Sequence, residues 1–424
     1  RDASLAHLNP QCRGGAATGI GRGLPSRLMR AGVRVMAAAT HAAVAAAPSC
    51  GVRVAARADA LAASVAEQVG ACAAAAASTP PGEGASWDEA MSLGGASLRA
   101  VAHFGAVGST QTVASELCAS GSPDELDGVA LVADLQTAGR GRSSHRWDSP
   151  PESSGLLVSL IRSVPAATAG KVLPLAQHVA SLAALRAVAA ACAGPAAPGA
   201  SARSASREGT AAPAPRMAIK WPNDLYVVGA LPPAAGPADG AAGAAATEAA
   251  GGSGSAAAAA SDVERALERH CGAPVRKAGG ILCTVAQPTG RARGGLFLVI
   301  GMGLNLSDAP PGRGAVADVH GRTSDPALLR QRVLGHFCRE VDSLWRRTVN
   351  GGGSSAWRDE YERAWMHAGQ RVKLPGGEWL ELAGLAETGG LVATDGFGGP
   401  LVELGTGNDT VDLMDGLVRV GKPQ

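Results

Sequence analysis

The sequence predicts an α+β fold followed by a small all-β domain. Between residues 97 and 366, short apolar runs of strand length alternate with longer segments of helical periodicity. The tail, residues 369–413, instead has four or five short strand candidates separated by glycine turns every 8–10 residues. Long alanine- and glycine-rich tracts interrupt both patterns, so the folded part is expected to be shorter than the 424 residues of the chain.

The charge balance and the cysteine pattern narrow the class of protein. The formal net charge is only +2, so a nucleic-acid-binding function would need a local basic patch. The chain has eight cysteines but no pair with CxxC spacing, which indicates reduced thiols and no zinc site. We find no leucine-grade apolar run of roughly 20 residues, the length of a membrane span, and therefore expect no membrane partner.

The first 57 residues carry eight arginines and a single acid, Asp2, in a background of Ala, Gly and Ser. This composition is typical of an organelle transit peptide, although an alanine-rich linker has the same composition. Apart from an alanine-rich helix candidate at 58–77, residues 1–95 show no pattern with a core face. We expect residues 1–95 to be transit peptide and linker, with a plastid or mitochondrial location, the cytosol as the alternative, and no DNA binding.

The elements expected from residue 97 onward alternate between strands and helices. They are a helix at 111–120 capped by Ser109 or Thr110, strands at 128–136 and 154–163, a long helix at 169–194, two strands within 216–228 joined at a PND turn, strands at 276–287 and 294–307, and helices at 325–347 and 356–366. Two low-complexity stretches, residues 195–215 and 229–275, are expected to be insertions that loop outward. The tail has the strand spacing of a β-barrel of SH3-like size.

The stretch QTAGRGRSSHRW, residues 136–147, is the first candidate for chemistry. Gly139 and Gly141 bracket Arg140, and Arg142 follows, so a flexible backbone carries fixed guanidinium donors between two expected strands. Such a loop suits a phosphate or a carboxylate. An RNA-binding segment and a solvated surface loop have a similar composition and stay open as alternatives.

Two further motifs lie on expected strands. In KWPND, Lys220 ends an apolar strand before a turn, where it can serve as a rigidly held cation for an anionic ligand. A solvated surface lysine is the alternative. In KAGGIL, Gly279 and Gly280 within a strand indicate that another group approaches the backbone closely.

A polar triplet, Ser109, Thr110 and Gln111, stands at an expected helix start. It can hold a carboxylate or simply cap the helix. We find no nucleophile–base triad, no P-loop and no complete dinucleotide fingerprint. If the chain is an enzyme, it is therefore expected to act by positioning and electrostatics, as in nucleotidyl transfer.

These motifs occur in one order: GSTQ, QTAGRGR, KWPND, KAGGIL, GMGLNL and then the β-rich tail. That order resembles the biotin–protein ligase (holocarboxylase synthetase) family over roughly residues 97–413, apart from the two insertions. The resemblance implies a mixed-sheet catalytic domain of the class II tRNA synthetase type at 96–349. It also implies a C-terminal helix and SH3-like β-barrel at 356–424.

The resemblance further implies an ATP-dependent, AMP-forming ligase. Biotin and ATP, with Mg²⁺, would give biotinyl-5′-AMP, and biotin would then pass to a carrier lysine. The partner would be the biotin carboxyl carrier domain of acetyl-CoA carboxylase or of another biotin-dependent carboxylase. A homodimer and a monomer are both open.

Residue roles follow from the same resemblance. Ser109, Thr110, Gln111 and Gln136 would contact biotin; Gly139, Arg140, Gly141 and Arg142 would lie along the carboxylate and phosphate; Lys220 would neutralise charge at the reacting groups; Gly280 would let its strand pass close to the ligand; and Asn305 would face the nucleotide. Lys220 and Arg142 are the predicted catalytic residues, and no residue is predicted to bind a metal. The sequence Ser143-Ser144-His145 departs from relatives that have further Arg-Gly residues there, which lowers the charge of this loop.

Two other functions are open. A lipoate- or octanoate-protein ligase would share the fold but carry different glycine-arginine motifs and no KWPND. A non-enzymatic RNA-binding protein would need a basic face with stacking aromatics, but the chain has only two tyrosines and four phenylalanines.

Overall fold

The computed structural model describes residues 43–47, 52–73, 81, 86–142, 145–150, 154–193, 214–229, 264–289, 295–374, 377–395, 399–404, 410–412 and 417–419. These residues belong to one compact unit, His41–Gln424. The expectations for residues 1–42, and for most of the insertions at 195–215 and 229–275, lie outside the described residues.

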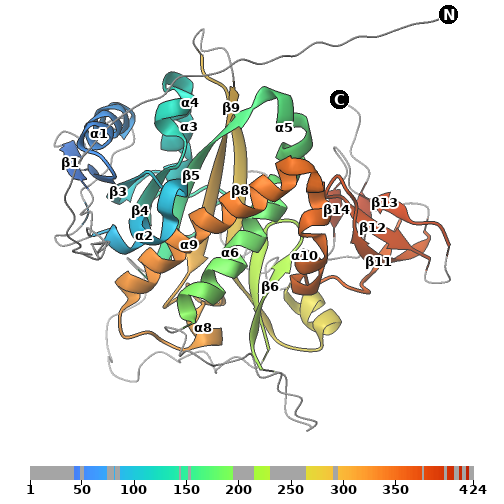
Figure 1. The fold of residues 1–424 in the computed structure, drawn as a ribbon. Coiled ribbons are helices and arrows are strands. Elements are labelled where there is room, and N and C mark those ends of the chain that lie inside the picture. The colour runs from blue at the N-terminus through green and yellow to red at the C-terminus, as the bar shows by residue number, and fades with distance from the viewer. Residues whose placement is uncertain are drawn as a thin grey trace, which may run out of the picture. The chain divides into compact units, whose positions relative to one another are not determined.

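A nine-stranded sheet in the order β1-β2-β3-β4-β5-β9-β8-β7-β6 forms the centre of the described fold (Figure 1). Its strands are β1 (Ala43–Ala47), β2 (Val52–Ala56), β3 (Ala100–Val107), β4 (Val129–Gln136), β5 (Gly155–Pro165), β6 (Arg216–Lys220), β7 (Asp224–Val228), β8 (Val275–Ala286) and β9 (Gly295–Asn305). Only β3 and β4 pair in parallel, and the other neighbours are antiparallel. The sheet is therefore mixed, and the predicted α+β class is confirmed.

Helices cover both faces of this sheet. One face packs against α2 (Asp88–Gly94), α5 (Ala166–Val172), α6 (Ala176–Cys192) and α9 (Pro326–Arg347), and the other against α1 (Asp59–Ala73), α3 (Thr110–Ser120) and α4 (Pro123–Leu126). Alternate residues of β4 serve the two cores: Val132 faces the first, and Leu131 and Ala133 face the second. The remaining elements are η2 (Gly95–Ser97), η4 (Leu173–Leu175), a helix at 264–271, α8 (Ala317–His320), η5 (Thr348–Gly352), η6 (Gly353–Ala356) and α10 (Arg358–Ala364).

The helix expected at 169–194 is divided into α5, the short 3₁₀ turn η4 and α6. Pro174 lies in η4, where its missing N–H interrupts the helical hydrogen bonds. By length and composition, Ala166–Cys192 could cross a membrane, which the sequence analysis did not anticipate. In this fold α6 packs against α9 and the sheet, and residues such as Val179 and Ala183 have no exposed surface.

The ordered fold begins earlier than predicted. Strand β2 pairs with β3, and its Val54 and Ala56 are fully buried, while α1 packs on the same face through Val65 and Val69. The expected alanine-rich helix at 58–77 is confirmed by α1, whereas the prediction of a linker up to residue 95 is wrong for β2 and α2. Alanine-rich elements give weak apolar periodicity, yet their small side chains let a helix and a sheet approach closely.

The C-terminal part forms a second, six-stranded sheet in the order β13-β12-β11-β10-β15-β14. Its strands are β10 (Arg371–Lys373), β11 (Trp379–Leu385), β12 (Leu391–Thr394), β13 (Val402–Leu404), β14 (Thr410–Asp412) and β15 (Leu417–Arg419). The predicted β-rich tail is confirmed: β10 to β14 are the five strands within residues 369–413, where four or five were expected, and β15 lies beyond that range. Leu380, Leu382 and Leu391 belong to the same apolar core as α6 and α9.

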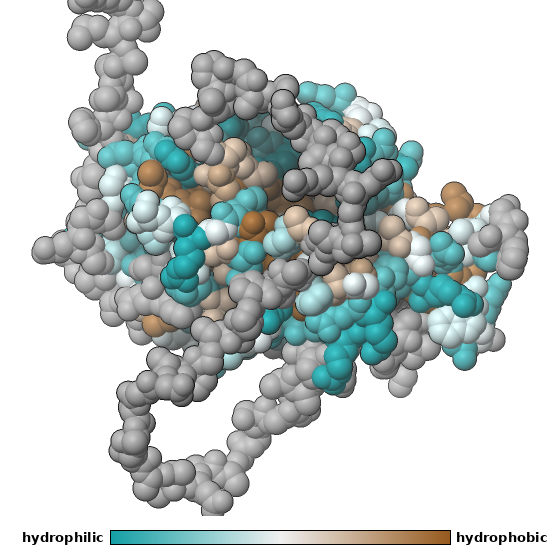
Figure 2. Space-filling model, turned by 90° about the horizontal axis from the view of Figure 1, so that it is seen from below, coloured by the Kyte–Doolittle hydropathy of each residue, from teal (hydrophilic) through white to brown (hydrophobic). Residues whose placement is uncertain are grey.

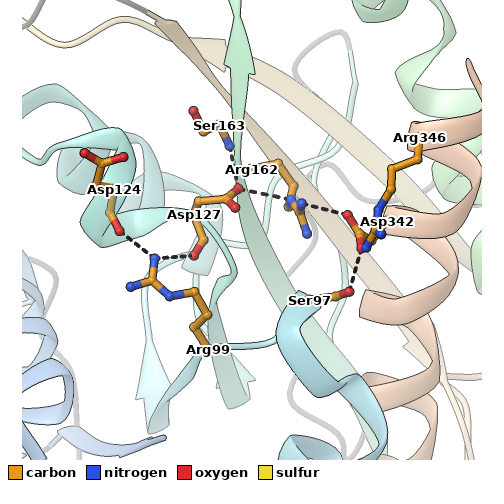
Figure 3. A network of polar contacts seen from close by, with 8 residues as sticks. All are labelled: Ser97, Arg99, Asp124, Asp127, Arg162, Ser163, Asp342 and Arg346. Atoms are coloured by element: carbon orange, nitrogen blue, oxygen red, sulfur yellow. Dashed lines mark hydrogen bonds and ion pairs between the residues drawn. The ribbon is translucent and has the colours of Figure 1, made fainter. Parts of the chain in front are cut away.

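A polar network joins α9 to the sheet (Figure 3). It lies near one end of β5, whereas the β5–β9 pair Gly155–Asn305 lies at the other end. Arg162 reaches Asp127 through Nε at 3.1 Å and Asp342 through Nη2 at 3.0 Å. Asp342 also accepts from Ser97 Oγ at 2.9 Å and pairs with Arg346. The carboxylates of Asp127 and Asp342 thus each have a basic partner.

Candidate active site

A cavity of about 510 Å³ opens where the N-terminus of α3, the loop after β4, and strands β6, β7, β8 and β9 meet. Nine of the eleven predicted site residues line it: Ser109, Thr110, Gln111, Gln136, Arg140, Gly141, Arg142, Lys220 and Gly280. On the face shown in Figure 2, hydrophobic and hydrophilic residues lie next to one another around a hollow. Motifs more than 170 positions apart in the chain therefore meet at one site, as the hydrogen bond from Gln111 Nε2 to Leu282 O shows.

Gly139 and Asn305 do not line the cavity. Gly139 packs against Trp147, whose backbone oxygen would lie 2.6 Å from an added Cβ. Asn305 is buried at the end of β9, where its Nδ2 donates to Gly314 O at 2.9 Å. In this structure both residues support neighbouring segments, and their predicted ligand contacts stay predictions.

The end of the cavity at α3 is uncharged and polar. Gln111 Oε1 accepts from Ser159 Oγ at 2.9 Å, and its Nε2 donates to Thr284 Oγ1 at 2.8 Å and to Val299 O at 3.1 Å. An added Cβ on Gly301 would lie 2.5 Å from Gln111 Oε1, so the glycine makes room for the amide. Gln111 thus holds α3 against β8 and β9.

Thr110 and Ser109 continue this polar end. The Thr110 backbone N–H donates to Gln136 Oε1 at 2.8 Å, and the Thr110 hydroxyl lies 2.9 Å from Ser159 Oγ. Ser109 is the N-cap residue of α3, but its side chain makes no capping bond. Its buried Oγ has no hydrogen-bond partner within the described part of the chain, so a hydroxyl at the positive end of the helix is available to a ligand.

The predicted arginine loop folds back on itself beside this end. Gly141 N donates to His145 O at 2.7 Å, and Trp147 N donates to Gly139 O at 3.0 Å. Arg146 donates to Thr137 O at 2.8 Å, which holds it at the far side of the loop. Residues 143 and 144 lie outside the described residues.

The other end of the cavity is strongly basic. Arg140, Arg142, Arg146, Lys220 and Lys277 line the cavity, and Asp224 is the one carboxylate among its described lining residues. Lys220 ends β6 directly opposite Asp224 at the start of β7, and the peptide bond between Trp221 and Pro222 in the turn between them is cis. This end therefore carries excess positive charge.

Short contacts fix the groups at the basic end. Lys277 Nζ lies 2.7 Å from Asp224 Oδ1, and Arg142 Nη1 donates to Asn223 Oδ1 at 3.1 Å. Burial would raise the pKa of Asp224, but the nearby Lys277 and Lys220 outweigh burial and hold the pKa below its ordinary value. Asp224 is therefore ionised and offsets only part of the surrounding positive charge.

Apolar walls connect the two ends. Val158, Ile281, Leu282 and Met302 contribute side chains, and Trp147 and Trp221 add aromatic surface. The Trp147 indole lies against Gly303, where an added Cβ would stand 2.5 Å from its ring. The cavity thus suits a ligand with an uncharged polar head, an apolar middle and an anionic end.

Residues 106–236 match the Biotin/lipoate A/B protein ligase family. Among curated proteins, "Biotin--protein ligase 2" of Arabidopsis thaliana is 28% identical over 301 residues, which cover 69% of this chain and 69% of the relative. "Biotin--protein ligase 1, chloroplastic" of Arabidopsis thaliana is 26% identical over 300 residues, which cover 69% of this chain and 62% of the relative. This chain is thus similar to the Biotin/lipoate A/B protein ligase family over residues 106–236 and to curated biotin–protein ligases.

Two further comparisons gave matches. "Biotin--[acetyl-CoA-carboxylase] ligase" of Mycobacterium tuberculosis (strain ATCC 25618 / H37Rv) is 26% identical over 283 residues, 65% of this chain and 75% of the relative. The solved biotin protein ligase from Aquifex aeolicus in complex with biotin and ATP has 20% identity and a TM-score of 0.43, covering 72% of this chain and 94% of that chain. The chain spans only 62% of the length of the chloroplastic biotin–protein ligase.

Sequence reasoning missed several residues of the cavity. Asn223 and Asp224 stand inside the KWPND motif, and Lys277 begins KAGGIL, so their motifs were a usable signal. Trp147 ends the stretch QTAGRGRSSHRW, so its motif was a usable signal too. Ser159 gave no such signal, because its role depends on a contact with Gln111 from a distant part of the chain.

Proposed function

We propose that the chain is a biotin–protein ligase, which activates biotin with ATP to biotinyl-5′-AMP and transfers it to a lysine of a biotin carboxyl carrier domain. One observation carries the proposal: a single cavity joins an uncharged polar end to a basic end, whose described lining has five cationic side chains and one carboxylate. Biotin has a neutral polar ring system, an apolar chain and a carboxylate, in that order. The family match and the curated relatives support the same activity.

The polar end binds the ring system of biotin. Ser109 Oγ, which has no partner among the described residues, and the Gln136 amide offer hydrogen bonds to a ureido group. Thr110 and Gln111 fix this end through Ser159. The apolar walls then enclose the chain and direct the carboxylate toward Lys220 and Arg142.

In the first step, a biotin carboxylate oxygen attacks the α-phosphorus of ATP. The new P–O bond gives the mixed anhydride, the bond to the β-phosphate oxygen breaks, and pyrophosphate leaves. Lys220 and Arg142 stabilise the negative charge that accumulates on the phosphoryl oxygens, and Arg140 and Lys277 add positive potential. No residue of the enzyme becomes covalently linked.

In the second step, the neutral amine of the acceptor lysine attacks the acyl carbon. An amide bond forms, the bond to the AMP oxygen breaks, and AMP leaves. The loop that carries Arg140 and Gly141 covers the adenylate and keeps water from hydrolysing it before transfer.

The described residues do not form a metal site of their own. They contain no group of three His, Cys, Asp or Glu residues that could hold a metal. The cavity's one described carboxylate, Asp224, is paired with Lys277. Mg²⁺ would therefore arrive with ATP and be held mainly by phosphate oxygens, whose charge it would neutralise. Asp224 would be its one protein carboxylate among the described residues.

Several finer assignments belong to this proposal. The six-stranded C-terminal sheet is an SH3-like β-barrel that begins after α10, and the catalytic domain precedes it. The chloroplastic relative supports a plastid location, and the acetyl-CoA-carboxylase ligase supports the carrier domain of acetyl-CoA carboxylase as the acceptor. A mitochondrial location and a homodimer remain alternatives for experiment.

Biotin-dependent exchange of ³²P between pyrophosphate and ATP tests the proposal. We expect exchange with biotin and Mg²⁺, and much weaker exchange with lipoate or octanoate at the same concentration. Absence of exchange with biotin would overturn the proposal. A preference for lipoate would assign the chain to the lipoate branch, and salt-sensitive RNA binding without any exchange would favour a non-enzymatic function.

A further inference from the structure

The turn that carries Lys220 is held by the C-terminal part of the chain. The Trp221 backbone N–H donates to His367 Nε2 at 3.1 Å, and the Trp221 indole N–H donates to Gly389 O at 3.1 Å. Tyr361 Oη donates to Pro222 O at 3.1 Å. Residues outside the cavity thus determine where this turn stands.

Strand β6 is held along its length by the same segment. Met366 N donates to Ile219 O at 2.8 Å, and Ile219 forms a parallel bridge with Trp365. His367 comes next in the chain and is the last contact before the turn. The segment 365–367 therefore extends the edge of the sheet and ends directly behind Lys220.

The hydrogen bonds fix the state of the His367 ring. Since the Trp221 N–H can only donate, Nε2 must accept and carry no proton. Nδ1 then carries the proton and donates to Gln370 Oε1 at 2.6 Å. The ring has no exposed surface, so water cannot replace either partner.

We propose that His367 is a positioning residue for the adenylation step: its Nε2 accepts the Trp221 N–H and thereby holds Lys220 against the reacting carboxylate and phosphate. The inference rests on the proposed ligase function. His367 does not line the cavity, so it acts through the backbone of the turn. A displacement of Lys220 by about 1 Å is enough to lower the rate of a charge-stabilised step by 10-fold or more.

Two substitutions separate the two hydrogen bonds of His367. In His367→Gln, the amide oxygen can take the place of Nε2 and accept from Trp221. In His367→Asn, the shorter amide reaches Gln370 but not Trp221. Both variants remove one buried hydrogen bond, so a purely structural role predicts similar behaviour for the two.

The measurements are kcat for biotin-dependent exchange, the Kd for biotin without ATP, and the melting temperature. We expect His367→Gln to stay within about 3-fold of the wild-type kcat and His367→Asn to lose about 10-fold, with biotin Kd unchanged in both. Glu362→Ala is the matched control, because Glu362 accepts from Leu385 N at 2.7 Å and so holds the C-terminal sheet without contacting the turn. It should lower the melting temperature and leave kcat unchanged.

The outcomes separate the inference from the function on which it rests. Equal kcat values for His367→Gln and His367→Asn would overturn the positioning role. Wild-type protein without biotin-dependent exchange would overturn the proposed function, and the inference with it. If His367→Asn does not fold, His367→Met fills the same space without a strong acceptor and takes its place in the comparison.

Discussion

The network around Asp342 and the basic end of the cavity use charge in opposite ways. At the network, Arg162 and Arg346 meet Asp342, and Arg162 also meets Asp127, so opposite charges are matched (Figure 3). In the cavity, five basic side chains face one described carboxylate. Matched charge fixes a structure, whereas unmatched charge in a hollow provides potential for an anionic ligand.

The two regions also differ in how they respond to acid. Burial lowers the pKa of His178 to about 4 and that of His367 to about 3, and both lie behind the Trp221 turn. The folded chain keeps them neutral while the unfolded chain protonates them below pH 6.5. The protonation of these two histidines therefore costs no stability well above pH 6.5. Below pH 6.5 the free energy of unfolding falls by about 1.4 kcal/mol per pH unit for each histidine, a total of about 4 kcal/mol by pH 5.

Urea unfolding at pH 7.5, 6.5 and 5 checks this expectation. In His178→Phe, which keeps the ring against Trp357, the loss should shrink to about half. The Asp342 network should not contribute in this range. Burial opposes ionisation of Asp342, but Arg346 and Arg162 outweigh it and hold the pKa below its ordinary value, so its stabilisation is lost only in stronger acid. A loss that His178→Phe leaves unchanged would contradict the assignment.

Lys220→Ala tests the role of the basic side chains in the cavity. Removing a cation from the reacting groups should lower biotin-dependent exchange by about 10²-fold, with little change in melting temperature. The control is Lys171→Ala, because Lys171 lies exposed in the last turn of α5. Equal activity of the two variants would remove Lys220 from the mechanism.

Asp342→Asn tests the role of the matched charges in the network around Asp342. The substitution removes one of the two carboxylate partners of Arg162 in a mostly buried place, so the free energy of unfolding should fall by about 2 kcal/mol. Exchange activity below the melting temperature should stay unchanged. Arg346→Ala, at a side chain that is 68% exposed, should cost less than about 1 kcal/mol, and a larger loss would show that its pairing matters more than its exposure allows.

The predictable part of the molecule is the part carried by local pattern. The stretch RMAIKWPNDLYVV gave β6, the turn and β7 because alternating apolar residues and a Pro-Asn turn are local signals. The motif residues around Lys220 and Arg142 were found in the same way. Strand β2 was missed because its alanines carry little periodic signal, whereas α1 lies within the helix candidate at 58–77.

Contacts made by folding could not be predicted from the sequence. The Trp147 ring contacts Gly303, a residue that follows it by 156 positions in the chain. The hydrogen bond between Trp221 and His367 spans 146 positions. Such pairs depend on sheet order, in which β9 lies between β5 and β8. They have no signal in spacing or composition.

Arg142→Ala should have a smaller effect than Lys220→Ala. Loss of the guanidinium removes one charge and the bond to Asn223, so biotinyl-5′-AMP should leave about 10-fold faster. A chase of preformed adenylate measures this rate. Arg146→Ala should change this dissociation rate less, because Arg146 already donates to Thr137 O. A larger effect for Arg146→Ala than for Arg142→Ala would place Arg146 nearer the phosphate.

Calorimetric titration of the wild-type chain with biotin and with biotinamide tests the central claim about unmatched charge most directly. The two ligands share ring and chain, and differ in whether the end that meets the basic side chains is charged. The account predicts that biotin binds at least about 5-fold more tightly and that added salt reduces the difference. Equal affinities at low salt would contradict it.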